Sequence, residues 1–184
     1  WGKCRTGAIT MYGAGVGVYG NSGYAYTGST PSKLKKRIEE ANSSNAEITD
    51  INITENGNYV IILGGSGYWT LGYPDAFLKK LEQYRTGDLR DDNILSACFN
   101  DRGEWVVITD KHYSYSNETI KNFILKAEEL YEEVYYAYIT NYGMIACCKN
   151  GVYYKNIPSN LAEALKKLTF KPKVIKFTDN GLYL

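Results

Sequence analysis

Few side chains in this chain could carry out catalysis. A cysteine nucleophile needs a base close enough to take the thiol proton, and the chain has four cysteines and one histidine. Cys98, Cys147 and Cys148 lie in apolar stretches, where a thiol is usually a small buried hydrophobic group, whereas His112 falls in a predicted turn. We therefore predict no catalytic residue. A small hydrolase that uses one of these cysteines with His112 is the alternative, and a Cys4–Cys98 disulfide is left open.

Carboxylates are abundant, and four of them lie close to predicted turns: Asp50, Asp101, Asp110 and Asp179. Asp is favoured in hairpin turns for backbone reasons alone, so we interpret these residues as structural. No metal site is predicted, because the chain has one histidine, no Cys-x-x-Cys pair and no loop with EF-hand spacing. No cofactor is expected either, since the glycine-rich segment 13–17 precedes another strand, where a dinucleotide fingerprint requires a helix.

Tyrosine is the residue type that the chain uses most unusually. The 184 residues include 18 Tyr, and the net charge is +1, from 21 Lys and Arg against 20 Asp and Glu. Tyr joins a large apolar ring to a polar tip, which suits a contact surface. A charge so close to zero provides no long-range field to attract nucleic acid, and no apolar stretch is long enough for a membrane span. We therefore predict neither nucleic-acid binding nor a membrane span.

Glycine turns divide the chain into repeats. Turn glycines recur at intervals of roughly 40 residues, at Gly13, Gly57, Gly103, Gly143 and Gly181. Most of these turns contain Asn or Asp, and each separates two apolar strands. We predict an α+β fold in a single repeat domain, 1–184, built from strand-strand-(strand)-helix units. The approximate unit bounds are 4–45, 46–92, 93–133 and 134–172, with a partial hairpin over 173–184.

Continuous apolar runs mark the first two strands of the units. The first strands are predicted at 48–53, 94–99, 134–139 and 174–177, and the second strands at 16–19, 59–63, 105–108 and 144–148. Such runs predict burial on both faces of the sheet. The units could form a closed ring or a short stacked array. We favour the ring, because an apolar edge at 174–177 would otherwise be exposed.

A helix is predicted at the end of each of the four complete units, from apolar residues at helical spacing. Pro31, Pro74 and Pro158 lie near three of the helix starts, where the missing N–H costs nothing. The candidate N-caps are Thr30, Ser159 and, in the third unit, Ser116 or Asn117. Lysine-rich stretches at 33–37, 79–80 and 166–167 are interpreted as solvated helix faces.

The short aromatic third strands are the best candidates for binding. Period-two alternation places Tyr24, Tyr26, Tyr68, Tyr113, Tyr115 and Tyr154 on one face, and Trp69 and Tyr153 on the other. One face must meet the helices or the core. We predict that the other presents a tyrosine-rich surface to a ligand, and the competing interpretation is that the rings only cover the repeats.

The repeat resembles one found in multidomain bacterial proteins, often beside caspase-like or trypsin-like peptidase domains. The resemblance rests on Gly103-Glu104-Trp105-Val106-Val107-Ile108 and Gly67-Tyr68-Trp69, and it extends over nearly the whole chain. Other units depart from it, with Val16, Tyr59 or Met144 near the position of Trp105. The resemblance implies an accessory or recognition module, bacterial and extracytoplasmic, without a catalytic residue.

These observations favour a non-catalytic binding or interaction module that engages a protein, a peptide or a polysaccharide through the third-strand tyrosines. A purely structural accessory domain and the cysteine hydrolase are the alternatives. The composition does not determine an oligomeric state.

Overall fold

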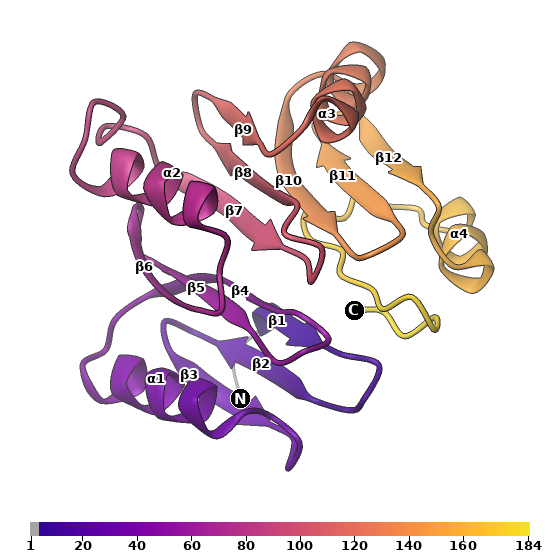
Figure 1. The fold of residues 1–184 in the computed structure, drawn as a ribbon. Helices are drawn as coiled ribbons and strands as arrows, with labels where there is room; N and C mark the ends of the chain where they lie inside the picture. The colour runs from indigo at the N-terminus through magenta and orange to yellow at the C-terminus, as the bar shows by residue number, and fades with distance from the viewer. Residues whose placement is uncertain (1–3) are drawn as a thin grey trace.

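The structure is a computed structural model that describes residues 4–184, and it consists of four antiparallel sheets with a helix after each (Figure 1). The first unit contains β1 (Cys4–Ile9), β2 (Gly15–Tyr19), β3 (Gly23–Tyr26) and α1 (Ser32–Ser43). The second contains β4 (Ile48–Ile53), β5 (Tyr59–Leu63), β6 (Gly67–Leu71) and α2 (Asp75–Arg85). The third contains β7 (Ile94–Phe99), β8 (Trp105–Thr109), β9 (Tyr113–Tyr115) and α3 (Glu118–Tyr131). The fourth contains β10 (Val134–Ile139), β11 (Met144–Cys148), β12 (Gly151–Lys155) and α4 (Ser159–Lys166).

Each sheet has three strands in chain order, so the predicted α+β repeat is confirmed. The first strands β1, β4, β7 and β10 lie toward the middle of the molecule, and the third strands lie outside (Figure 1). Within residues 4–184, no strand pairs with a strand of a neighbouring sheet. The units therefore meet through side chains, helices and turns.

A β-bulge occurs at the same place in every first strand. The register shifts between the first and third residues of β1, β4, β7 and β10. A bulge bends a strand and re-aims its side chains. The third residues are Thr6, Asp50, Ser96 and Tyr136, all of which are buried.

The hairpin turns explain the recurring glycines. Gly13, Gly57, Gly103 and Gly181 have φ between 79° and 94°, a region that favours glycine. Gly143 differs because its turn is one residue shorter. The backbone N–H of Thr140 closes this turn by donating to the carbonyl of Gly143. A Cβ at Gly143 would lie 2.5 Å from the carbonyl oxygen of Asn156, so this glycine is required for space.

The residues observed at the helix N-termini show that part of the N-cap prediction is wrong. Pro31, Pro74 and Pro158 occupy the N-cap positions themselves, without a side-chain cap. Thr30 does not cap α1, because its hydroxyl donates to the carbonyl of Gly15 at 2.8 Å, and Ser159 is already the first residue of α4. Asn117 caps α3 as predicted, accepting from Ile120 N at 3.0 Å.

Each of the first three helices packs between its own sheet and the next one. Leu34 and Ile38 of α1 share a core with Ile61 of the second sheet, and α2 shares a core with the second and third sheets. The largest core surrounds α3 and joins the third and fourth sheets. Central strands such as β5 contribute to the cores on both sides, with Ile61 facing one and Val60 the other. The predicted burial on both faces is thus confirmed.

The C-terminal segment forms a hairpin with a single β-bridge, between Phe177 and Tyr183. The predicted strand 174–177 is therefore only a short bridged segment. Ile175 and Phe177 pack into the core of the fourth unit, while Lys176 reaches Thr6 of the first unit. No helix within residues 4–184 is long and apolar enough to cross a membrane.

Candidate functional site

The eight aromatic residues predicted to bind lie on the outer strand of each sheet. Most of their side chains are half-buried, and Tyr26 is the most open at 37% exposure. Tyr24 and Tyr26 stack on each other with ring centroids 5.4 Å apart. The rings are therefore only partly accessible to solvent.

Three of these tyrosines are bound to the helix of their own unit. The hydroxyl of Tyr26 donates to Glu39 at 2.8 Å, that of Tyr68 donates to Glu82, and that of Tyr113 donates to Glu128 at 3.0 Å. Burial, assisted by the adjacent carboxylate, raises the pKa of Tyr113 to about 12. These phenols therefore stay neutral and hold the helix against the sheet.

The other face of the third strand meets the helix of the preceding unit. The guanidinium of Arg37 in α1 lies 5.2 Å from the ring centroid of Trp69, and Phe123 in α3 packs on Tyr153 at 5.0 Å. Helices thus border both faces. Five of the eight aromatic residues line separate grooves beside β6, β9 and β12, namely Tyr68, Trp69, Tyr113, Tyr115 and Tyr154.

The groove beside β6 is the roomiest of these three. Its volume is about 410 Å³, compared with about 240 Å³ beside β9 and 220 Å³ beside β12. One wall is α1 of the first unit, and the other is β6 with the segment that follows it. Tyr68, Trp69 and Tyr73 provide aromatic surface in this groove, and Tyr73 is 37% exposed. We call this the α1–β6 groove.

Basic side chains rim the α1–β6 groove. Lys33, Lys36 and Arg37 line it, with Glu40 as the one acidic lining residue. Arg37 is paired with Glu40 at 2.7 Å. Within residues 4–184, no ion pair involves Lys33 or Lys36. Two exposed ammonium groups therefore remain available to an anionic ligand.

The sequence pattern did not indicate that these basic residues lie beside an aromatic groove. Glu39 and Glu40 follow the lysine-rich stretch at 33–37, a pattern that predicts a solvated helix face. The structure brings part of that stretch against Trp69, which belongs to the next unit. The repeat order contains a usable signal, since a helix that sits between two sheets must face the third strand of the following unit.

The three candidate nucleophiles, Cys98, Cys147 and Cys148, lack the exposure and the nearby base that an activated thiol needs. Cys98, Cys147 and Cys148 are fully buried, and the thiol of Cys98 donates to the carbonyl of Ala137 at 3.7 Å. His112 is exposed and pairs instead with Asp92, through Nδ1 at 2.6 Å. All four cysteines are free, so Cys4 and Cys98 are not bonded.

The stability of the fold is expected to fall as the pH rises above about 9. Burial raises the pKa of Cys98 and of Cys147 to about 12, and that of Cys148 to about 11, from an ordinary value of 9.0. Because the folded-state pKa is the higher one, the stabilisation is complete below pH 9.0 and is lost as the pH rises through the folded-state values. Urea unfolding at about pH 8 and about pH 10.5 measures the loss.

Two cysteine variants control this pH experiment. Cys147→Ala removes one buried thiol and should reduce the loss of stability, whereas Cys4→Ala, at an exposed position, should leave it unchanged. An undiminished loss in Cys147→Ala would show that other groups cause it.

The four candidate aspartates have structural partners, and the prediction that Asp50 lies close to a turn is wrong, because Asp50 lies within β4. Asp110 accepts from Asn93 N and Nδ2 at 2.9 and 2.7 Å, and Asp179 accepts from the hydroxyl of Thr140 at 2.5 Å. Asp101 accepts from Asn56 N at 3.3 Å. Asp50 is 1% exposed and forms an ion pair with Lys176 at 2.8 Å.

The Asp50–Lys176 pair is the centre of a buried polar network. Oδ1 of Asp50 also accepts from the hydroxyls of Thr6 at 3.2 Å and Tyr136 at 3.4 Å. Its Oδ2 accepts from Asn52 Nδ2 at 2.8 Å and from Ala97 N at 3.3 Å. The network joins all four units to the C-terminal segment, and the sequence pattern did not indicate it.

Among residues 4–184, no three His, Cys, Asp or Glu side chains are grouped so that they could hold a metal ion. No protein-family model matches the chain, and a search of the curated proteins finds no match either. The geometry of the grooves and of the central network is therefore the basis for a functional proposal.

Proposed function

We propose that this chain is a non-catalytic binding module, and that the α1–β6 groove receives an acidic segment of a protein or peptide. The observation that carries the proposal is the pairing of aromatic side chains with unpaired basic ones in a single groove. Aromatic rings and basic groups are typical anchors of binding interfaces, and the buried thiols provide no competing chemistry.

The position of β6 favours an extended peptide. β6 is the outer strand of its sheet and pairs only with β5 among residues 4–184. Its outer edge has backbone groups of the kind that a peptide strand can pair with. An acidic peptide added along β6 would place carboxylates near Lys33 and Lys36 and a side chain against Trp69.

The remaining third-strand residues extend the same proposal. Tyr113 and Tyr115 line the groove beside β9, and Tyr154 lines the one beside β12. Tyr24 and Tyr26 lie on β3, and Tyr153 lies on β12. We treat these positions as secondary contact sites, because the groove beside β6 combines more volume with unpaired cations.

Replacing Trp69 with Ala is expected to weaken the binding of acidic peptides by about tenfold or more, because an aromatic anchor in a groove carries a large share of the binding energy. The charge reversals Lys33→Glu and Lys36→Glu are expected to reduce the affinity further and to remove its salt dependence. Binding is measured by fluorescence anisotropy with labelled Glu-rich peptides at two salt concentrations.

The matched control reverses Lys79 and Lys80, which lie on α2 and do not line the groove. These reversals change the net charge equally and should leave binding intact. Equal binding by the wild type and Trp69→Ala would contradict the groove assignment. Preferential binding of acidic oligosaccharides in a parallel assay would replace the peptide with a polysaccharide ligand.

We also propose that the four units and the C-terminal hairpin form a closed ring with Lys176 as its clasp. Two observations support this arrangement. Lys176 belongs to the last segment of the chain, yet its ammonium group donates to Thr6 in the first unit at 3.3 Å and to Asp50 in the second. In addition, a Cβ added at Gly7 of β1 would lie 3.7 Å from the side chain of Leu184.

A further inference from the structure

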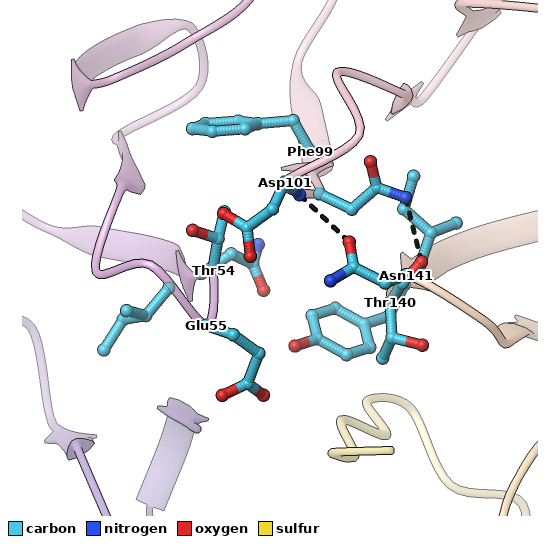
Figure 2. A pocket seen from close by; sticks show the side chains of 11 residues that line it. Thr54, Glu55, Phe99, Asp101, Thr140 and Asn141 are labelled. Atoms are coloured by element: carbon cyan, nitrogen blue, oxygen red, sulfur yellow. Dashed lines mark hydrogen bonds between the residues drawn. The ribbon is translucent and has the colours of Figure 1, made fainter. Parts of the chain in front are cut away.

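Three strand ends converge on a small cavity near the middle of the molecule (Figure 2). The segments 52–55, 99–101 and 138–141 line it, at the ends of β4, β7 and β10. These are equivalent positions in the second, third and fourth units. Figure 2 shows the side chains of Thr54, Asp101 and Asn141 directed toward one another from the three segments.

Three of the residues that line the cavity each have a buried oxygen atom without a hydrogen-bond partner among residues 4–184: Asn52 Oδ1, Thr54 Oγ1 and Asp101 Oδ1. Asn52 and Thr54 are only 4% and 7% exposed. A buried polar atom without a partner costs free energy, so such atoms are rare unless they meet something. Three of them in one cavity indicate a common binding partner.

The orientation of the Asn52 amide is determined by its hydrogen bonds. Its Nδ2 donates to Asp50 at 2.8 Å and to the carbonyl of Ala97 at 2.7 Å. The carbonyl oxygen of the side chain must therefore be the atom at the cavity. Asp101 is constrained similarly, since its other oxygen accepts from Asn56 N. The cavity thus contains acceptor atoms, with the hydroxyl of Thr54 as the one donor among the three.

The surroundings of the cavity are negatively charged. Glu55 and Asp101 line it, and Asp179 lies close enough to repel Glu55. Burial is the main cause that raises the pKa of Glu55, and the repulsion from Asp179 adds to it. None of the three carboxylates forms an ion pair with a basic side chain among residues 4–184.

The size of the cavity restricts its occupant. Its volume of about 20 Å³ suits one water molecule or one ion and excludes an organic ligand. Carboxylate, amide and hydroxyl oxygens are the ligands that Ca²⁺ prefers, in a flexible arrangement that water molecules can complete. Mg²⁺ demands a near-ideal octahedron and gives up its water reluctantly, so it fits this irregular set less well.

We propose that this cavity binds a hard divalent cation, Ca²⁺ by preference, through Asp101 Oδ1, Asn52 Oδ1 and Thr54 Oγ1, while the carboxylate of Glu55 points away from these atoms and accepts from Met11 N at 2.8 Å (Figure 2). Asp101 comes from the third unit and the other ligands from the second. The ion therefore joins two units at the turn end of their first strands. With so few charged ligands, the expected dissociation constant is about 10⁻⁴ to 10⁻³ M, in the range of extracellular calcium modules.

The test titrates the metal-stripped protein with CaCl₂ and follows heat release and melting temperature. A saturable increase in melting temperature is expected, because a ligand that binds only the folded state stabilises it. Asp101→Asn and Thr54→Val should each weaken Ca²⁺ binding by about tenfold or more, since the first removes the charge of the carboxylate ligand and the second removes the hydroxyl ligand. Asp88→Asn, which removes an exposed charge elsewhere, should bind Ca²⁺ like the wild type.

The stability of Asp101→Asn and Thr54→Val without Ca²⁺ distinguishes loss of Ca²⁺ binding from misfolding. Without Ca²⁺, Asp101→Asn should be at least as stable as the wild type, because it removes repulsion and keeps an oxygen for Asn56 N. Thr54→Val provides a second variant of similar shape. No saturable response up to about 10 mM Ca²⁺ would overturn the proposal and assign the cavity to water. Wild-type affinity in both variants would also overturn it.

Discussion

Replacing Lys176 with Met is expected to lower the free energy of unfolding by about 3 to 5 kcal/mol, the usual cost of removing one partner from a buried ion pair. The side chains of Lys176 and Asp50 are 0% and 1% exposed, so Asp50 would be left as an uncompensated charge in the core. Urea denaturation of the wild type and the variant measures the difference.

Two further variants isolate the ion pair itself. Lys173→Met removes an exposed ammonium group from the same segment and is expected to change the stability by less than about 0.5 kcal/mol. Adding Asp50→Asn to Lys176→Met should restore part of the lost stability, because the double variant buries no unpaired charge. A loss below about 1 kcal/mol in Lys176→Met would be typical of a surface pair and would contradict the role of Lys176 as a clasp.

Replacing Phe77 with Ala is expected to destabilise the fold by a similar amount, about 3 to 5 kcal/mol. Phe77 is fully buried in α2, and its ring centroid lies 5.2 Å from that of Phe99 and 5.9 Å from that of Trp105. Both partners belong to the third sheet. The substitution therefore removes contacts that join two units as well as apolar area within one.

Leu78→Ala provides the matched control for Phe77→Ala. Leu78 is the next residue of α2 and is only partly buried, so its truncation should cost clearly less. Thermal and urea unfolding of the two variants give the comparison. Equal losses would contradict the larger contribution expected of Phe77, whose ring packs between two sheets.

The elements within a unit were predictable because their causes are local. The glycine turns, the apolar runs and the helical spacing of apolar residues are all properties of short segments. The strand bounds of β4, β7 and β10 agree with those predicted. The errors lie at the helix starts, where Pro31 and Pro158 take the N-cap position and displace Thr30 and Ser159 from that role.

The contents of the candidate site were less predictable. The third-strand tyrosines were identified from their alternation, but their pairing with Glu39, Glu82 and Glu128 depends on where each helix crosses its sheet. The basic rim of the α1–β6 groove joins residues from two units. A pattern within one unit does not contain that contact.

The repeat, the class of fold and the aromatic third strands follow from local sequence patterns, since each is a periodic property of neighbouring residues. The contacts between units at the centre of the fold depend on tertiary packing. Asp50 and Lys176 are 126 residues apart and resemble ordinary surface charges in the sequence, yet they form a buried pair. The unpartnered oxygens of Asn52, Thr54 and Asp101 likewise share one cavity only because separate units bring their strand ends together. Contacts of this kind depend on how whole units pack, and local periodicity does not encode that packing.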